Sequence, residues 1–110
     1  MDEVLLLLTN LPDAASAEAL ALRLVETRLA ACVNQLQPCH SVYRWQGKTE
    51  TAQEVPLLIK TVRSRYAAVE ALVQALHPYD VPELIAVPVV AGLSDYLNWV
   101  RQETAPEISC

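Results

Sequence analysis

The sequence predicts an α+β domain in which helices pack on an antiparallel sheet. Two patterns alternate along the chain: short apolar runs typical of strands, and longer segments whose apolar residues recur at helical spacing. Their order is β-α-β-β-α-β, followed by a short closing helix. The chain has 110 residues, the length of one domain with one core. We therefore predict a single domain over residues 1–110.

The first strand and helix are indicated by an apolar run and a helix cap. Residues 4–8 are continuously apolar, as in a strand covered on both faces. Asp13 follows the break and can cap a helix. Arg28 falls inside the apolar stripe of this helix, so it must snorkel or find a partner. The stripe consists of Ala17, Leu20, Ala21, Leu24 and Val25.

A long hairpin is predicted next. Residues 31–45 lose the helical period and carry β-branched and aromatic residues, as in an irregular strand with a kink at Pro38. Gly47 can take the positive φ that a tight hairpin turn needs. The return strand runs from about 51 to 62. Pro56 cannot donate a ladder hydrogen bond, which places this part of the strand at an edge or a bulge.

The second half repeats the order of helix and strand. Ser64 is the predicted cap of a helix that ends at His77, because Pro78 disfavours helical geometry at the preceding residue. The segment LIAVPVV, residues 84–90, is the last predicted strand, and residues 94–103 form the closing helix. The stripe of the second helix consists of Val69, Leu72, Val73 and Leu76.

This order is the split βαβ, or ferredoxin-like, arrangement. Two right-handed crossovers place both long helices on one face of the sheet. The other face has only the closing helix to cover it, and the hairpin is too long to lie wholly within the sheet. Apolar residues make up 53% of the chain and charged residues only 19%. The uncovered sheet face and the long hairpin predict burial by neighbouring copies in a closed homotrimer.

Composition argues against several partners and locations. A net charge of -5 and a pI near 4.9 leave no basic stripe for nucleic acid or for an anionic membrane surface. No apolar run approaches the ~18 residues of a membrane span, and MDEVLLLLTN lacks the positive charge of a secretory signal. Cys32, Cys39 and Cys110 have no CxxC spacing. We therefore predict neither disulfides nor a zinc site, and a reducing cytoplasm.

The segment HPYDVPEL, residues 77–84, concentrates polar side chains in one connection. Pro78 and Pro82 fix two φ angles, so Tyr79 and Glu83 are presented with little entropy left to lose. The pattern indicates a rigid polar loop that can hold a ligand or dock a neighbouring subunit.

Two interpretations of His77 stay open. Neutral imidazole is a good ligand for copper and zinc, which makes His77 a candidate metal ligand. Alternatively, the imidazole satisfies the last carbonyls of the helix.

Cys39 and His40 look like a chelating pair, but neighbours on a strand point to opposite faces. Cys32 is expected to be a small core residue, and Cys110 is terminal.

Segments spread over nearly the whole chain resemble the CutA, or divalent-cation tolerance, family. These segments are LAACVN, SVYRWQGKTE, LLIKT, HPYDVPELIAVPV and YLNWV, in this order. The resemblance implies a ferredoxin-like subunit in a tight homotrimer whose hairpins pair with neighbouring sheets. It also implies a cytoplasmic bacterial protein linked to tolerance of copper or other divalent metals. Some members carry a cysteine and a second histidine where this chain has Thr9 and Leu76, so we expect weak binding of the cation and no essential cofactor.

A cleft between subunits is the predicted site. Lys60 closes the apolar segment LLIK, where an ammonium is costly unless it reaches an acid or solvent. Two interpretations are open for Lys60 and the acids nearest to it in the predicted fold. They form a surface ion pair, or they belong to one polar cleft between subunits. The resemblance favours the cleft, because these residues fall inside the matching segments. The candidate acids are Glu50, Glu54 and Glu83. The predicted cleft consists of Trp45, Glu50, Lys60, Tyr79 and Glu83, with His77 as the metal ligand.

The favoured function is a non-enzymatic trimer that binds copper or another divalent cation weakly at that cleft. The alternative is a sensor or interaction platform similar to the trimeric PII-type signalling proteins, with a small-molecule or protein partner and no metal role. A glycine-rich phosphate loop is not indicated, since the chain has only Gly47 and Gly92. An acylphosphatase-type enzyme would need an arginine after the first strand, where TNLPD has none.

Overall fold

Strands and helices alternate through residues 1–106, the part of the chain that the computed structural model describes. In chain order the elements are β1 (Val4–Leu11), α1 (Ala14–Glu26), β2 (Cys32–Gln35), β3 (Cys39–Trp45), β4 (Lys48–Val62), α2 (Tyr66–Leu76), β5 (Ile85–Pro88) and α3 (Ser94–Glu103). A 3-10 turn at Arg63–Arg65 precedes α2. The predicted combination of three helices with an antiparallel sheet is confirmed, but three strands lie between α1 and α2 where two were predicted.

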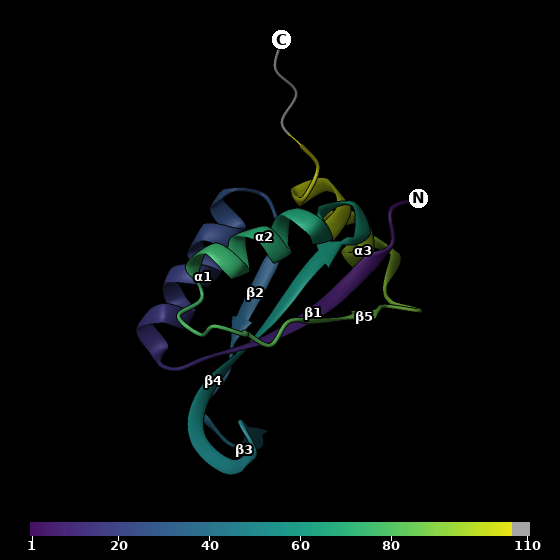
Figure 1. The fold of residues 1–110 in the computed structure, drawn as a ribbon. Coiled ribbons are helices and arrows are strands. Elements are labelled where there is room, and N and C mark those ends of the chain that lie inside the picture. The colour runs from purple at the N-terminus through teal and green to yellow at the C-terminus, as the bar shows by residue number, and fades with distance from the viewer. Residues whose placement is uncertain (107–110) are drawn as a thin grey trace.

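The sheet is antiparallel and is built around β4. Its strand order is β2-β4-β1-β5, and β3 pairs with the outer part of β4 beyond the end of β2. Figure 1 shows β3 and β4 curving away from the rest of the sheet as a ribbon. The predicted long strand over residues 31–45 is therefore two strands, separated at residues 36–38 around the expected kink. The last strand is shorter than LIAVPVV and ends at Pro88.

Pro56 lies in a central strand, so the predicted edge position was wrong. Its carbonyl accepts a hydrogen bond from the N–H of Leu36 at 3.0 Å. The N–H and C=O positions of one strand residue face the same neighbour, so the missing donor of Pro56 also faces the break between β2 and β3. The one ladder hydrogen bond that Pro56 cannot donate therefore falls where the neighbouring strand, β2, has already ended.

The helix caps agree with the sequence at α1 and differ at α2. Asp13 caps α1, accepting from the N–H of Ser16 at 2.8 Å, and this hydrogen bond lowers the pKa of the Asp13 carboxyl. Ser64 was wrongly predicted to cap α2: it lies in the 3-10 turn and bonds to the Asp2 carboxylate. The helix ends before His77, as predicted.

The two faces of the sheet differ in their cover. Alternate residues of β1 and β4 point toward α1 and α2 and form the main core. Figure 1 shows these helices together on that face. On the opposite face α3 covers one end, where Val100 packs with Val4 and Val62. The rest of that face is called the open face, and it also carries Lys60, Cys32 and Asn34 toward β2. Its apolar residues are Leu6, Leu8, Leu58, Ile85 and Val87. Ile85 is 52% exposed and Val87 45% exposed.

Two predicted core positions are not core. Val25 in α1 and Leu76 in α2 lie at the margins of their stripes and are exposed.

Arg28 finds the partner that the sequence required. It follows α1 at φ 61, and its guanidinium donates to the carbonyl oxygens of Gln102 at 2.8 Å and Ala105 at 2.9 Å. The positive φ thus ends α1, and the arginine bonds one carbonyl in the last turn of α3 and one just beyond it.

The hairpin tip is a two-residue turn. Gln46 has φ 50 and Gly47 has φ 79, and two positive φ values in succession are the signature of the type I′ turn that favours hairpins. The predicted positive φ at Gly47 is confirmed, and the non-glycine residue beside it shares the left-handed conformation. Within the described part of the chain, no helix is both long enough and apolar enough to cross a membrane.

Candidate functional site

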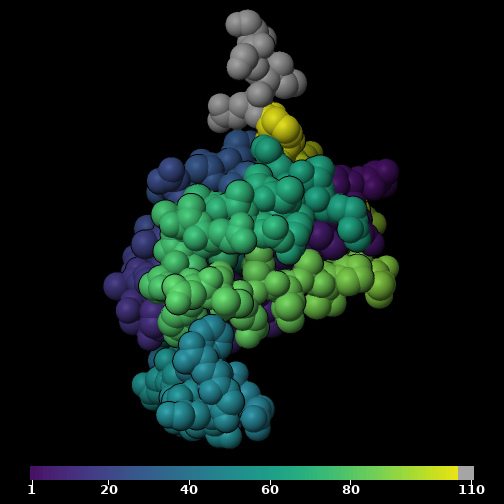
Figure 2. Space-filling model, in the orientation of Figure 1, coloured from purple at the N-terminus to yellow at the C-terminus, as the bar shows by residue number. Residues whose placement is uncertain are grey.

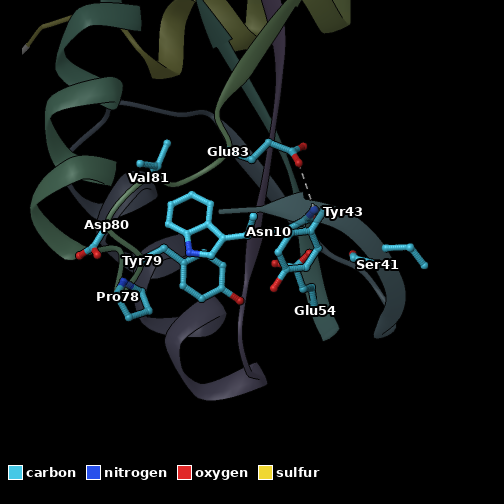
Figure 3. A pocket seen from close by; sticks show the side chains of 11 residues that line it. Asn10, Ser41, Tyr43, Glu54, Pro78, Tyr79, Asp80, Val81 and Glu83 are labelled. Carbon is cyan, nitrogen blue, oxygen red and sulfur yellow. Dashed lines mark hydrogen bonds between the residues drawn. The ribbon is translucent and has the colours of Figure 1, made fainter. Parts of the chain in front are cut away.

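A cavity of about 700 Å³ lies between the hairpin and the loop that follows α2. Figure 2 shows the hairpin as a lobe set off from the body of the molecule, below the chain segment that contains this loop. Figure 3 shows the cavity from close by. Its lining comes from three segments: the end of β1 (Asn10), the hairpin (Ser41, Val42, Tyr43, Trp45, Glu54) and the loop (Pro78, Tyr79, Asp80, Val81, Glu83).

The strand register explains why the hairpin contributes aromatic rings and a carboxylate. Alternate residues of β3 share one face of the ribbon, which places Tyr43 and Trp45 together. Residues paired across the ladder share that face as well, so Glu50 opposite Tyr43 and Glu54 opposite Cys39 also belong to it. Glu54 is 9% exposed and lines the cavity, whereas Glu50 is exposed and lies outside it.

His77 fixes the loop against β1. The backbone N–H of Tyr79 donates to His77 Nδ1 at 3.2 Å, so Nδ1 is an acceptor and the ring proton lies on Nε2. His77 Nε2 donates to the carbonyl oxygen of Asn10 at 2.6 Å. Asn10 lies beyond the last residue of β1 that pairs with β5, Leu8. His77 therefore bonds a carbonyl at a strand end, not the helix carbonyls expected from the sequence.

The imidazole ring of His77 packs against the ring of Tyr79. The two ring centroids are 4.8 Å apart with an interplanar angle of 50°, a tilted aromatic contact. His77 is 7% exposed, so the histidine serves as a buried support for the tyrosine at the cavity wall. In this conformation both of its ring nitrogens are hydrogen-bonded, and neither is free to bind a metal.

The Tyr79 hydroxyl stands in an acidic environment. Figure 3 shows its ring extending toward Tyr43 and Glu54, while the Asp80 carboxylate points away from them. Burial of the phenol, together with the neighbouring Glu54 carboxylate, raises the pKa of Tyr79 to about 12. The ring is therefore a neutral phenol at physiological pH and can donate its O–H.

The cavity is acidic and carries no opposing charge among the described residues that line it. Its carboxylates belong to Glu54, Asp80 and Glu83, and no Lys, Arg or His lines it. The amide of Asn10 donates to Glu83 Oε1 at 3.4 Å, a long hydrogen bond that orients this carboxylate (Figure 3). A cation is the ligand that this charge pattern favours.

The structure brings together three of the six predicted site residues, Trp45, Tyr79 and Glu83. Lys60 lies elsewhere, on the same side of the sheet as the open face. Its ammonium donates to Asn34 Oδ1 and lies 4.0 Å from Cys32 Sγ, so the expected acidic partners were wrong. Cys32, expected in the core, is half-buried at this edge of the sheet.

Tyr43 and Asn10 were missed as site residues, and Glu54 was considered only as a partner for Lys60. The signal for Tyr43 and Glu54 was present in the alternation of the hairpin, since both share a ribbon face with a predicted site residue. Asn10 could not be found in this way, because only the tertiary fold brings the end of β1 under the loop.

Cys39 and His40, the other candidate metal ligands that the structure describes, do not converge. Cys39 and His40 are adjacent in β3 and pair with different residues of β4, so they point to opposite faces. Cys110 lies outside the described residues. Across residues 1–106, no three His, Cys, Asp or Glu side chains are grouped so that they could hold a metal ion. A site within one chain thus lacks a preformed metal cage.

Comparisons with known proteins agree with each other. Residues 5–103 match the family model described as CutA1 divalent ion tolerance protein. The divalent-cation tolerance protein CutA of Thermus thermophilus is 44% identical over 104 residues, which cover 94% of this chain and 99% of that protein. The crystal structure of CutA from Xylella fastidiosa is 50% identical with a TM-score of 0.91, covering 94% of this chain and 99% of that one. A CutA from Archaeoglobus fulgidus, described as periplasmic, is 35% identical with a TM-score of 0.90, covering 93% and 99%.

Proposed function

The chain belongs to the CutA1 divalent ion tolerance family, and on this premise we propose that it is a non-enzymatic, cytoplasmic homotrimer that serves in tolerance of or response to copper or another divalent metal. The strand order supports a ferredoxin-like subunit. The cation is bound weakly at a cleft between subunits and is not an essential cofactor. Neither nucleic acid nor a membrane is a partner in this proposal.

The acidic cavity is the observation that carries the binding proposal. Three acidic residues line it, the carboxylates of Glu54 and Glu83 lie on the side of Tyr43, and the described lining has no basic residue (Figure 3). Oxygen donors suit hard divalent cations, and imidazole or sulfur donors suit copper better. Because one chain groups no three ligands among its described residues, the coordination would be completed by donors of a second copy.

The open face supports the assembly. Its apolar residues lie in the middle and at the edge of the sheet, and Ile85 and Val87 are each about half exposed in the isolated chain. The hairpin also leaves the outer edge of β3 without a strand partner in the described residues. Exposed apolar sheet surface and a free strand edge are both unfavourable in water. A closed ring of copies covers both.

His77 stays a predicted metal ligand with a condition attached. It can coordinate a metal only if it gives up a hydrogen bond to Asn10 or to Tyr79. We therefore assign direct binding in the first place to Glu54 and Glu83, and to His77 the positioning of the loop.

Titration calorimetry with Cu²⁺ tests the site. We expect Glu54→Gln and Glu83→Gln to weaken Cu²⁺ binding in a protein that still assembles, because each removes one negative charge and keeps the shape. Glu18→Gln, an exposed residue of α1, is the matched control and should leave binding unchanged. Equal affinity in the wild type and both cavity variants would remove the cavity from the metal site.

Light scattering on a dilute sample tests the assembly. The expected mass is three times the 12.1 kDa of the chain. A monomer or a dimer would contradict the proposed trimer, whatever the Cu²⁺ titration gives.

The second candidate function is a sensor or interaction platform without a metal role, similar in architecture to PII-type proteins. The volume of the cavity and its aromatic walls favour this candidate, since a bare ion needs neither. The acidic lining makes an anionic ligand, such as a phosphate ester, a poor fit.

A further inference from the structure

We infer that the cavity between the hairpin and the 78–83 loop binds an organic cation, an ammonium or guanidinium group carried on a short aliphatic chain. The inference rests on the proposed function in one respect: both place the ligand in the same cavity. It names a different ligand, recognised by side chains that a metal ion does not need.

The first observation is a buried carboxylate without a cationic partner. Glu54 is only 9% exposed, and none of the ion pairs formed within residues 1–106 includes it. The burial of most of the Glu54 side chain makes its negative charge less favourable unless an opposite charge lies nearby. The hydroxyl of Tyr79 beside it offers a neutral dipole. A bound cation would supply the missing charge.

The second observation is the aromatic wall. Tyr43, Trp45 and Tyr79 all line the same cavity as Glu54. Indole and phenol rings attract cations over their faces, most strongly for tryptophan. Aromatic rings with a carboxylate among them are the arrangement that recognises substituted ammonium groups, whose methylene groups also bury well against apolar surface.

The dimensions of the cavity within one chain suit an organic cation. A divalent metal needs several donors at roughly 2.0–2.6 Å from one point, and no such group forms within the described residues. The cavity of about 700 Å³ falls in the range of small-molecule sites. Val42, Pro78 and Val81 provide apolar lining for the aliphatic part.

The cation has two possible sources with the same chemistry. One is a free amine or guanidine. The other is a basic side chain of a neighbouring copy, and the hairpin carries two exposed candidates, Arg44 and Lys48. Neither forms a side-chain hydrogen bond or ion pair within the part of the chain that the structure describes. The experiment therefore needs an arm without these two side chains.

Calorimetric titration of the full chain with hexylammonium chloride tests the inference, with hexan-1-ol as the neutral probe of equal length. We expect hexylammonium to bind at least tenfold more tightly than the alcohol. Glu54→Gln should reduce this preference to near one. Trp45→Leu should weaken hexylammonium by a factor of about 2 to 30, the range of a cation–π contact. Glu18→Gln, an exposed residue of α1 outside the cavity lining, is the control and should change nothing.

A fluorescence readout places the probe. The chain has two tryptophans, so in Trp99→Phe the emission comes from Trp45 alone. Hexylammonium should shift that emission and hexan-1-ol should not. If the wild type does not respond but Arg44→Gln/Lys48→Gln does, the inference is supported and the natural cation is a neighbouring side chain.

Two results would overturn the inference. One is equal affinity for the amine and the alcohol, which would make the cavity merely apolar. The other is no binding of hexylammonium to either the wild type or the Arg44→Gln/Lys48→Gln variant. Titration of the same variants with Cu²⁺ separates this failure from that of the proposed function. Trp45→Leu should leave Cu²⁺ binding intact, because an indole ring is not a metal donor and the proposed donors are the carboxylates of Glu54 and Glu83.

Discussion

The two halves of β4 belong to one continuous strand and have opposite environments. From Val55 to Val62 it runs between β1 and β2, and its helix-facing side chains are fully buried. From Lys48 to Glu54 it pairs only with β3, and most of its side chains are exposed. The ladder continues through both halves, so the halves differ in burial and in having strand partners on two sides or on one.

This difference separates stability from chemistry. The inner half holds the apolar contacts that stabilise the fold, while the outer half brings Glu54 and its neighbours in β3 to the cavity. A ribbon that extends from a rigid sheet keeps the register of its side chains without contributing to the core. The binding residues can thus vary without loss of the fold, provided that the inner half is unchanged.

The largest expected effect comes from truncating the inner half. Ile59 is fully buried in the main core, and Ile59→Ala should lower the free energy of unfolding by about 2–5 kcal/mol, since it removes apolar contacts and leaves a cavity. Thr49→Ala in the outer half is the matched change in the same strand and should cost under about 1 kcal/mol. Denaturant unfolding at one fixed protein concentration measures both.

Assembly with neighbouring copies could remove the difference in burial between the two halves of β4. A cost for Thr49→Ala as large as that for Ile59→Ala would mean that a neighbouring copy buries the outer half, and the hairpin would then belong to a second core. Repeating the unfolding at several protein concentrations identifies this case, because stability that comes from association rises with concentration.

An intermediate effect is expected at the hairpin tip. Gly47 has φ 79, and nothing lies within 4 Å of the position that a Cβ would occupy. Gly47→Val should therefore cost about 1–2 kcal/mol per subunit through backbone strain alone. Gln46→Asn should instead gain a few tenths of a kcal/mol, because asparagine tolerates the left-handed conformation that residue 46 adopts. Thermal unfolding of both variants should show shifts of opposite sign, and two shifts of the same sign would mean that the turn is of another type.

Local physics accounts for what the sequence could predict of the fold. The Asp13 cap and the end of α2 before Pro78 each depend on residues within one turn of each other, and both were predicted. The prediction for Ser64 failed because its partner is Asp2, which lies 62 residues earlier in the chain. Pro56 failed because its interruption is matched by one on a different strand. Capping and proline rules see only local alternatives, and in both cases a distant segment decided the outcome.

The site residues show the same difference between local features, which could be predicted, and contacts with distant segments, which could not. Tyr79 and Glu83 lie on a short proline-bounded loop, so their presentation could be predicted from the chain itself. Lys60 was misplaced because its side of the strand is fixed by the register with Cys32, which the sequence does not specify. His77 was correctly singled out as special, but its bond to Asn10 depends on where β1 ends relative to β5.

The smallest expected effect concerns the ionisation of Tyr79, which links the outer half of β4 to the loop. Burial and the Glu54 carboxylate raise the pKa of Tyr79 from 10.0 to about 12, so the folded protein favours the neutral phenol. Any stability from this shift is complete below pH 10, the pKa of the unfolded chain, and is lost as pH rises toward 12. Subtracting the phenolate absorbance of Tyr79→Phe from that of the wild type isolates this group from the other tyrosines. Glu54→Gln should move the midpoint of the difference curve down, because the carboxylate that opposes the phenolate is gone, although burial still holds it above 10. An unchanged midpoint in Glu54→Gln would mean that the charge of the carboxylate does not reach the loop, and the two walls of the cavity would then act independently.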